Sequence, residues 1–311
     1  MRTAVCFGCN EAYMPLCRGL VLSLQRALAA APKDLDISLH FIDIGCETAS
    51  LAELKKAGVS LHVFSRKLYK NLPGEDLLPR YADAQLCRPF LPQLVRGYDC
   101  YLWIDTDAWV QAADALPTVI RAAESARGGI VMCPEYHYGF VGKRDLRLGL
   151  LAARTWYEAL YDDPALVEGL SAQPILNSGF FTLAADSPIW EAWGNELISL
   201  YARDYTQDRS VLHYAEQLGL NKLLYTGQSF VPLDPIFNYP CAGSAVFVSP
   251  NGTLCVGYPP FTPLKTAHLL AFSYYGRQYL DQGMLFDGGR YLTEAERATL
   301  NGLIKKKSPP V

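Results

Sequence analysis

The chain has 311 residues, of which 50% are hydrophobic and 19% are charged, as in an ordinary globular protein. Its formal net charge of −3 argues against nucleic acid as a partner, because nucleic-acid binders carry a basic excess on one face. A small anionic substrate stays open, because a bound metal ion supplies positive charge locally. The sequence has no run of the roughly 18–20 apolar residues that a membrane span needs. Its first residues resemble a short strand and not the core of a signal peptide.

The nine cysteines are scattered, and most lie in apolar runs. This usage is typical of reduced core cysteines, so we expect a cytoplasmic protein without a disulfide framework. Cys6 and Cys9 have a CxxC spacing, but a four-ligand zinc site needs a second pair, and none lies nearby in the sequence.

The first half of the chain alternates between strand and helix patterns. Strand patterns cover 3–7, 37–44, 59–64, 101–104 and 129–133, and helix patterns cover 14–30, 50–57 and 82–95. Pro89 and Pro92 are expected to shape or kink the last helix. Strands separated by helices predict an α/β fold with a parallel sheet and helices on both faces. Ligands of such sheets bind beyond the carboxyl ends of the strands, so the residues after Phe7, Ile104 and Cys133 are candidates for a site.

The second half is less regular. We expect a strand over 176–183 entered through an Asn-Ser-Gly turn, and a helix over 188–201 capped by Asp186 or Ser187. A hairpin is predicted over 245–257, a strand over 267–272 and a helix over 293–304, before a basic tail. No internal repeat or linker interrupts the sequence, which favours one compact domain with a C-terminal elaboration.

Asp105 and Asp107 directly follow the apolar run 101–104. That run has the pattern of a central parallel strand, buried on both faces. Two carboxylates at its end repel each other and are costly to desolvate unless a cation joins them. Oxygen ligands suit Mg²⁺ or Mn²⁺, which keep open positions for phosphate oxygens. The alternative, a loop cap beside a solvated aspartate, is disfavoured by the buried strand before the pair and by Trp109-Val110 after it.

Around this Asp-x-Asp pair the sequence resembles the family 8 glycosyltransferases, retaining enzymes of the GT-A type that include glycogenin and bacterial lipopolysaccharide sugar transferases. Segments that match the family's motifs follow one another in its order. They are Asn10 with Tyr13, the helix 81–92 with Arg88, the metal segment 101–107, Asn177-Ser178-Gly179, the segment 208–212 for the family's Asp-Gln-x-x-Leu-Asn, Phe237-Asn238 for its Trp-Asn pair, and His268.

The resemblance implies a Rossmann-like GT-A single domain over 1–290, with a mixed, mainly parallel central sheet and helices on both faces. Its nucleotide-binding half would be 1–135 and its acceptor half 136–290, followed by a C-terminal helix and basic tail over 291–311. The implied activity is metal-dependent transfer of a hexose from a UDP-sugar to a saccharide or other hydroxyl acceptor, with retention.

The resemblance also implies roles for individual residues. Asp105, Asp107 and His268 hold the metal, and the imidazole favours Mn²⁺ over Mg²⁺. Nucleotide and metal contacts fall to Asn10, Tyr13, Arg88, Asp105, Thr106 and Asp107. Catalytic roles fall to Asn177, Asp208 and Arg209, and substrate contacts to Ser178, Gly179, Glu135, His137 and Asn238.

Simpler interpretations stay open for several of these residues. His268 is also compatible with a core position, and the segment 177–179 is compatible with a plain turn. Asp208 is compatible with a helix cap, and Glu135 and His137 are compatible with ordinary loop residues. Trp156 and Trp193 are expected in helix cores and not as platforms for a sugar.

The chain departs from the family in two places. Arg209 and His213 stand where the family has Gln and Asn, and no lysine follows His268 in the family's position. Stabilisation of the leaving group then falls to Arg209, Arg277, Lys265 or the metal. A nucleotidyltransferase is disfavoured, because the loop Gly8-Cys9-Asn10-Glu11 is neither Gly-rich nor basic. A non-catalytic protein that binds nucleotide sugars or carbohydrate stays open.

Overall fold

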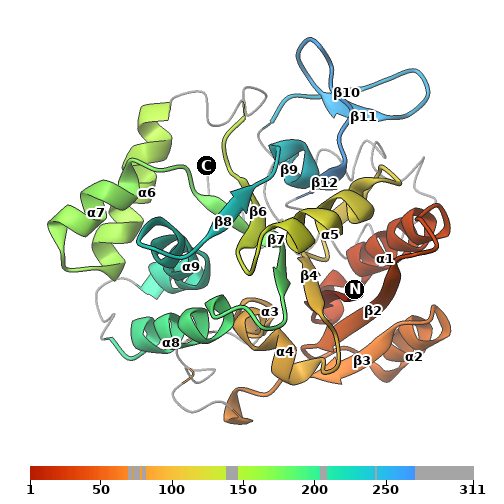
Figure 1. Ribbon diagram of the computed structural model, residues 1–311, viewed down its shortest axis with the longest axis horizontal. Coiled ribbons are helices and arrows are strands. Elements are labelled where there is room, and N and C mark those ends of the chain that lie inside the picture. Colours follow the sequence, from red (N-terminus) through yellow and green to blue (C-terminus); the bar gives the residue numbers. More distant parts are fainter. Residues whose placement is uncertain are drawn as a thin grey trace.

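The structure is a computed structural model of the chain (Figure 1). It describes residues 1–68, 72, 78, 82–137, 146–203, 209–241 and 244–269. None of the described helices is both long enough and apolar enough to cross a membrane. The expected helix 293–304, the basic tail, the boundary after residue 290, Arg277 and Asp208 lie outside the described residues.

The described residues form a central sheet of seven strands in the order β3-β2-β1-β4-β7-β6-β8. The strands are Ser60–Val63 (β3), Asp36–Asp43 (β2), Arg2–Cys9 (β1), Cys100–Ile104 (β4), Leu176–Ala184 (β7), Ile130–Pro134 (β6) and Phe230–Pro232 (β8). Neighbouring strands are parallel except at β7, which is antiparallel to both β4 and β6. The mixed, mainly parallel sheet is confirmed. The strands β1, β2, β3, β4 and β6, which were predicted from the alternating first half of the chain, all run in the same direction, and only β7 of the second half is antiparallel to its neighbours among the described strands of this sheet.

Helices cover both faces of the sheet, as predicted (Figure 1). One face carries α1 (Met14–Ala29), α2 (Thr48–Lys56) and α5 (Ala115–Ser125). The other carries α3 (Asp83–Leu86), α4 (Leu91–Leu94), α6 (Leu146–Leu160), α7 (Pro164–Ser171), α8 (Ile189–Tyr201) and α9 (Ala215–Tyr225). Alternate side chains of a strand point to opposite faces. Val5 and Phe7 of β1 therefore join the first cluster, and Ala4 and Cys6 join the second.

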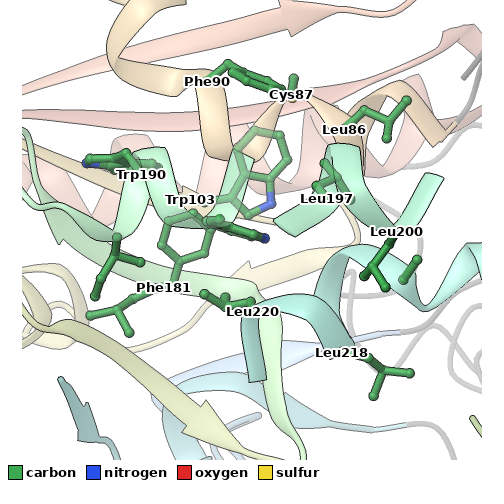
Figure 2. Packing of buried hydrophobic residues seen from close by; sticks show 14 of the residues in the cluster. Leu86, Cys87, Phe90, Trp103, Phe181, Trp190, Leu197, Leu200, Leu218 and Leu220 are labelled. Atoms are coloured by element: carbon green, nitrogen blue, oxygen red, sulfur yellow. The ribbon is translucent and has the colours of Figure 1, made fainter. Parts of the chain in front are cut away.

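The core beneath β4 and β7 is rich in aromatic side chains (Figure 2). Phe181 of β7 meets Trp193 of α8 edge-on, with ring centroids 5.3 Å apart. Trp103 of β4 belongs to the same cluster and is fully buried. Large, well-packed rings on both strands hold the end of β4 firmly, which matters because the aspartate pair follows it directly.

A small sheet, β5-β12-β9, lies beside the end of β4. Its strands are Ala108–Val110 (β5), Thr266–His268 (β12) and Tyr239–Pro240 (β9). The hairpin of β10 (Val246–Val248) and β11 (Leu254–Val256) confirms the one predicted over 245–257. Single 3₁₀ turns fill several connections: η1 (Glu11–Tyr13), η2 (Arg66–Leu68), η4 (Arg88–Phe90), η6 (Arg209–His213) and η7 (Pro235–Asn238).

Three local predictions are wrong. The helix expected over 82–95 is broken into α3, η4 and α4, because Pro89 and Pro92 have no N–H to donate within it. The segment 177–179 lies inside β7 and is not a turn. The N-cap of α8 is Pro188 and neither Asp186 nor Ser187; the Ser187 hydroxyl accepts from the Ile189 N–H at 3.3 Å and donates to the Gly128 carbonyl at 2.5 Å.

Candidate functional site

Asp105, Asp107 and His268 form a trio at the end of β4. One ligand atom from each lies within 4.8 Å of the other two. Asp105 follows Ile104 directly, the chain turns, and β5 then pairs with β12, which sets His268 opposite Ala108. The Leu269 N–H also donates to the Asp107 carbonyl at 2.8 Å, so the backbone itself holds the two segments together.

The chemistry of the trio fits a divalent cation. His268 Nε2 lies 3.2 Å from Asp107 Oδ1, and its buried Nδ1 has no hydrogen-bond partner among the described residues. Burial lowers the pKa of His268, but the carboxylates of Asp107, Asp105 and Glu135 outweigh burial, and the pKa is raised. The site thus favours positive charge. Two carboxylates and an imidazole suit Mn²⁺, and Mg²⁺ less well.

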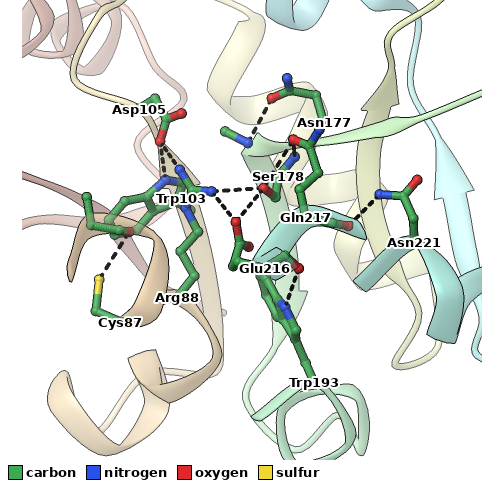
Figure 3. A network of polar contacts seen from close by, with 12 residues as sticks. Cys87, Arg88, Trp103, Asp105, Asn177, Ser178, Trp193, Glu216, Gln217 and Asn221 are labelled. Carbon is green, nitrogen blue, oxygen red and sulfur yellow. Dashed lines mark hydrogen bonds and ion pairs between the residues drawn. The ribbon is translucent and has the colours of Figure 1, made fainter. Parts of the chain in front are cut away.

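Arg88 of η4 is buried and contacts Asp105 of this trio (Figure 3). Its Nη2 donates to Asp105 Oδ1 at 2.5 Å, and its Nη1 donates to Glu216 Oε2 at 2.7 Å and to the Ser178 hydroxyl at 2.8 Å. Burial lowers the pKa of Arg88, but Asp105 and Glu216 raise it above its usual value, so the guanidinium stays charged. One buried cation therefore joins the metal trio to the opposite wall of the site.

The start of β7 supplies that wall. The Asn177 amide donates to Glu135 Oε1 at 2.7 Å, and its Oδ1 accepts from the Gly179 N–H and from Asn238. A Cβ at Gly179 would overlap Asp105 Oδ2, so this glycine leaves room for the metal carboxylate. Because β7 is antiparallel to its neighbours, its first residues lie at the carboxyl edge of β4, where Asp105 is.

The first turn of α9 closes the site with Glu216 and Gln217. The Ser178 hydroxyl donates to Glu216 Oε2 at 3.0 Å, and the Ser178 N–H donates to Gln217 Oε1 at 3.0 Å. Burial raises the pKa of Glu216, although Arg88 and the Ser178 hydroxyl oppose the rise. Its second oxygen, Oε1, is buried and has no hydrogen-bond partner among the described residues.

Together these side chains line one pocket of about 360 Å³, a volume suited to a small-molecule ligand. Most predicted site residues are among its walls: Asn10, Tyr13, Arg88, Asp105, Thr106, Asp107, Glu135, Asn177, Ser178, Gly179 and His268. The pocket lies beyond the carboxyl ends of β1, β4 and β6, the edge that the sequence predicted.

Two predicted residues with described side chains, Asn238 and His137, are not in the lining. Asn238 acts from behind by donating to Asn177, and the His137 ring instead meets Tyr239 at 5.6 Å. Arg209 begins η6, and its side chain is not described. Lys265, considered for the leaving group, lies outside the pocket and pairs with Asp114 at 2.6 Å.

Sequence reasoning missed Glu216 and Gln217, although a signal was present. The run Glu216-Gln217-Leu218-Gly219-Leu220-Asn221 has the pattern acidic-Gln-x-x-Leu-Asn that was assigned to 208–212, with Glu in place of Asp. Gln85, His213 and Tyr214 also line the pocket without having been predicted. Trp193 is fully buried as expected, whereas Trp156 is only partly buried and stacks on Tyr214 with centroids 4.4 Å apart.

No protein-family model and no curated protein matches the sequence. Solved structures do match. The bifunctional glycosyltransferase WbbM in its apo form has a TM-score of 0.55 at 16% identity, over 78% of this chain and 40% of that one. The galactosyltransferase LgtC, solved with donor and acceptor sugar analogs, has a TM-score of 0.55 at 13% identity, over 99% of this chain and 97% of that one. The chain has the GT-A fold.

This GT-A fold explains why residues distant in sequence share one pocket. Strands β1 and β4 are neighbours in the sheet, so the loop after β1 and the aspartate pair after β4 open to the same edge. The antiparallel β7 brings Ser178 to that edge from the other side. The fold thus creates a cleft with the Asp105–Asp107–His268 trio on one wall, and amides, hydroxyls and the carboxylates of Glu135 and Glu216 on the other.

Proposed function

We propose that the chain is a metal-dependent glycosyltransferase, similar to family 8, that moves a hexose from a UDP-sugar to a saccharide or other hydroxyl acceptor with retention of configuration. The observation that carries the proposal is the shared pocket. The Asp105–Asp107–His268 trio opens into the same cavity as Arg88 and Glu216. A diphosphate needs a cation, and a sugar needs neutral and acidic hydrogen-bonding groups, and the pocket offers both.

Asp105, Asp107 and His268 would hold the metal, Mn²⁺ or Mg²⁺. When bound, such an ion neutralises the diphosphate and acts as a Lewis acid on the departing nucleotide. Arg88 is the only Lys or Arg among the described residues of the lining, and two carboxylates already engage it. We therefore propose that the metal, and not Arg88, stabilises the negative charge of the leaving group. Arg209 and Arg277 stay predictions for this role, because their side chains are not described.

Asn10 and Tyr13 would contact the nucleotide. They follow β1 and lie at the end of the pocket that includes Gly8 and Cys9. The buried Asn10 Oδ1 has no hydrogen-bond partner among the described residues, and it is placed to accept a bond from a base or ribose group. Thr106, between the two aspartates, is buried and lines the same pocket.

The sugar would lie between β7 and α9. Glu216 Oε1 is a buried acceptor with no hydrogen-bond partner in the part of the chain that the structure describes, so a sugar hydroxyl is a suitable donor to it. Gln217, Ser178 and Gly179 complete this wall, and Asn177 orients it by joining Glu135 to the Gly179 N–H. We assign to Glu216 and Gln217 the role that the resemblance gives to Asp208 and Arg209. The roles of Asp208 and Arg209 stay predictions, because the side chains of these two residues are not described.

No protein base is required in this proposal. With retention, the departing phosphate oxygen accepts the proton of the acceptor hydroxyl. The residues of this chain then bind and orient both substrates. The acceptor is expected beside His213 and Tyr214, which line the pocket next to Glu216.

A donor screen tests the proposal. UDP-, GDP- and dTDP-hexoses are added with Mn²⁺, and thermal shift identifies the ligand, because a ligand that binds only the folded state raises the apparent melting temperature. Release of nucleotide diphosphate from that donor is then measured with and without EDTA. We expect metal-dependent release from a UDP-hexose. Metal-dependent binding without any release would instead indicate a non-catalytic nucleotide-sugar-binding protein.

We also propose a cytoplasmic location. All nine cysteines lie in described residues, and none forms a disulfide. Unpaired, mostly buried thiols are typical of proteins kept in a reducing compartment.

A further inference from the structure

One oxygen of Asp105, Oδ1, accepts two hydrogen bonds from other side chains of the protein. Oδ1 accepts from the Trp103 indole N–H at 2.7 Å and from Arg88 Nη2 at 2.5 Å (Figure 3). The other oxygen, Oδ2, lies against Gly179. The carboxylate therefore has one oxygen tied to the protein interior and one beside Gly179, which lines the pocket together with Asp105.

Trp103 is the unusual partner in this arrangement. It is fully buried near the end of β4, two residues before Asp105, where a residue with no polar atom would fill the core without needing an acceptor. Its ring also lies under the Arg88 guanidinium, 5.2 Å from Cζ. One side chain thus contacts both members of the Arg88–Asp105 pair, through its ring face and through its N–H.

We propose that Trp103 is a positioning residue for the metal site, whose indole N–H fixes Asp105 so that only Oδ2 is presented to the divalent cation. The proposal rests on the metal site of the proposed function. The side-chain torsion that turns a carboxylate is soft, so an Oδ1 held by Arg88 alone allows Asp105 a wider range of orientations than an Oδ1 held by both donors. An anchored oxygen removes that freedom before the ion arrives.

Two effects of the N–H oppose each other. A donor on Oδ1 withdraws charge from the carboxylate and weakens its attraction for a cation. The same donor orients the ligand, and loss of such outer partners typically costs 10–100-fold in metal affinity or activity. Since Arg88 still withdraws charge from Oδ1 when Trp103 is replaced, the orienting effect dominates the change.

Trp103→Phe isolates the N–H, because phenylalanine retains a ring in the core and beneath Arg88. Trp193→Phe is the matched control. Trp193 is equally buried, and its indole N–H donates to the Glu216 carbonyl at 3.3 Å, not to a metal ligand. Both variants lose one buried indole donor, so a purely structural role predicts the same behaviour for both.

The readout is Mn²⁺ affinity, measured from the electron paramagnetic resonance signal of unbound Mn²⁺. We expect Trp103→Phe to weaken Mn²⁺ binding at least tenfold and Trp193→Phe to change it less than twofold, with UDP binding in EDTA equal in all three proteins. Equal Mn²⁺ affinity in both variants overturns the inference and leaves the proposed function intact. A wild-type protein that binds no Mn²⁺ overturns both.

A second measurement needs no variant at position 103. The indole N–H resonances of the ¹⁵N-labelled wild-type protein are followed during Mg²⁺ addition, and Trp103 is assigned by elimination with Phe replacements of the other four tryptophans. We expect the Trp103 resonance to shift more than that of Trp193, because its acceptor becomes a metal ligand. An unshifted Trp103 resonance at saturating Mg²⁺ refutes the proposal even if Trp103→Phe does not fold.

Discussion

Arg88 is the cation that compensates the charges of two carboxylates of the pocket, Glu216 and Asp105, and so stabilises the folded state. Its side chain is 5% exposed, and its partners Glu216 and Asp105 are 1% and 24% exposed. We take Arg88→Met as the perturbation, because methionine fills much of the same space without charge or donors. The variant leaves Glu216 fully buried, and among the described residues the Ser178 hydroxyl is then its one remaining side-chain hydrogen-bond donor.

The magnitude follows from that burial. Removing one partner of a buried ion pair costs about 3–5 kcal/mol, because the remaining charge is uncompensated. Glu216 dominates this cost, since Asp105 is partly exposed to solvent and retains the Trp103 donor. For a chain of 311 residues, we expect the melting temperature to fall by roughly 5–8 °C.

The cost depends on pH in a defined direction. Burial raises the pKa of Glu216 above its model-compound value of 4.5, and Arg88 is the largest opposing influence. Without Arg88 the folded-state pKa rises further above the unfolded one. The folded state of the variant then prefers the protonated acid, so its stability falls as the pH rises from about 4.5 toward the folded-state pKa. The deficit relative to wild type is therefore larger at pH 7.5 than at pH 5.

Urea unfolding followed by circular dichroism tests this reasoning, with EDTA present so that metal occupancy is constant. Wild type, Arg88→Met, Glu216→Gln and the double variant form a cycle. Neutral glutamine should recover roughly 1–3 kcal/mol in the Arg88→Met background, because the two sites are in direct contact. A deficit below about 1 kcal/mol at pH 7.5, or strictly additive effects, refutes the buried-pair argument.

Three further outcomes are expected. Gly179→Ala should weaken Mn²⁺ binding about tenfold or more, because its Cβ displaces Asp105 Oδ2. The control Gly169→Ala, whose Cβ meets nothing within 4 Å, should leave Mn²⁺ binding unchanged. Equal Mn²⁺ affinities of the two variants in the electron paramagnetic resonance titration would contradict the reasoning. Burial, with the charge of His62, lowers the pKa of His40 to about 4, so stability is lost as the pH falls from about 6.5 to about 4. His40→Phe should flatten the plot of melting temperature against pH in this range. An unchanged slope of that plot would show that His40 is not the source of the loss. Asn221→Ala removes bonds of 2.7 and 2.8 Å to the Leu176 backbone and should lower the unfolding free energy by roughly 1–3 kcal/mol, visible as a lower urea midpoint.

Features that depend on neighbouring residues were predictable from the sequence. Periodicity located β1, β2, β3, α1 and α2, because each buries a side determined by its own residues. Asp105 and Asp107 were predictable as a site for the same reason, since two carboxylates directly after a buried strand require a compensating charge.

Features that depend on distant pairing were not predictable in this way. Nothing local shows that β7 inserts antiparallel between β4 and β6, so 177–179 was taken for a turn although it lies within the strand. The burial of Glu216 is likewise set by α9 packing against β7 and by Arg88, which is far away in sequence. The acidic-Gln-x-x-Leu-Asn pattern at 216–221 was readable, but only the pocket indicates that it belongs there.

Calorimetric titration of UDP tests the metal site of the proposed enzyme most directly. Wild type, Asp107→Asn and the control Asp114→Asn are compared in Mn²⁺ and in EDTA; Asp114 lies on the surface, paired with Lys265. We predict that wild type and Asp114→Asn bind UDP in Mn²⁺ and lose most of that affinity in EDTA, and that Asp107→Asn binds weakly in both. Equal UDP affinity in all three proteins, with or without Mn²⁺, would contradict the assignment.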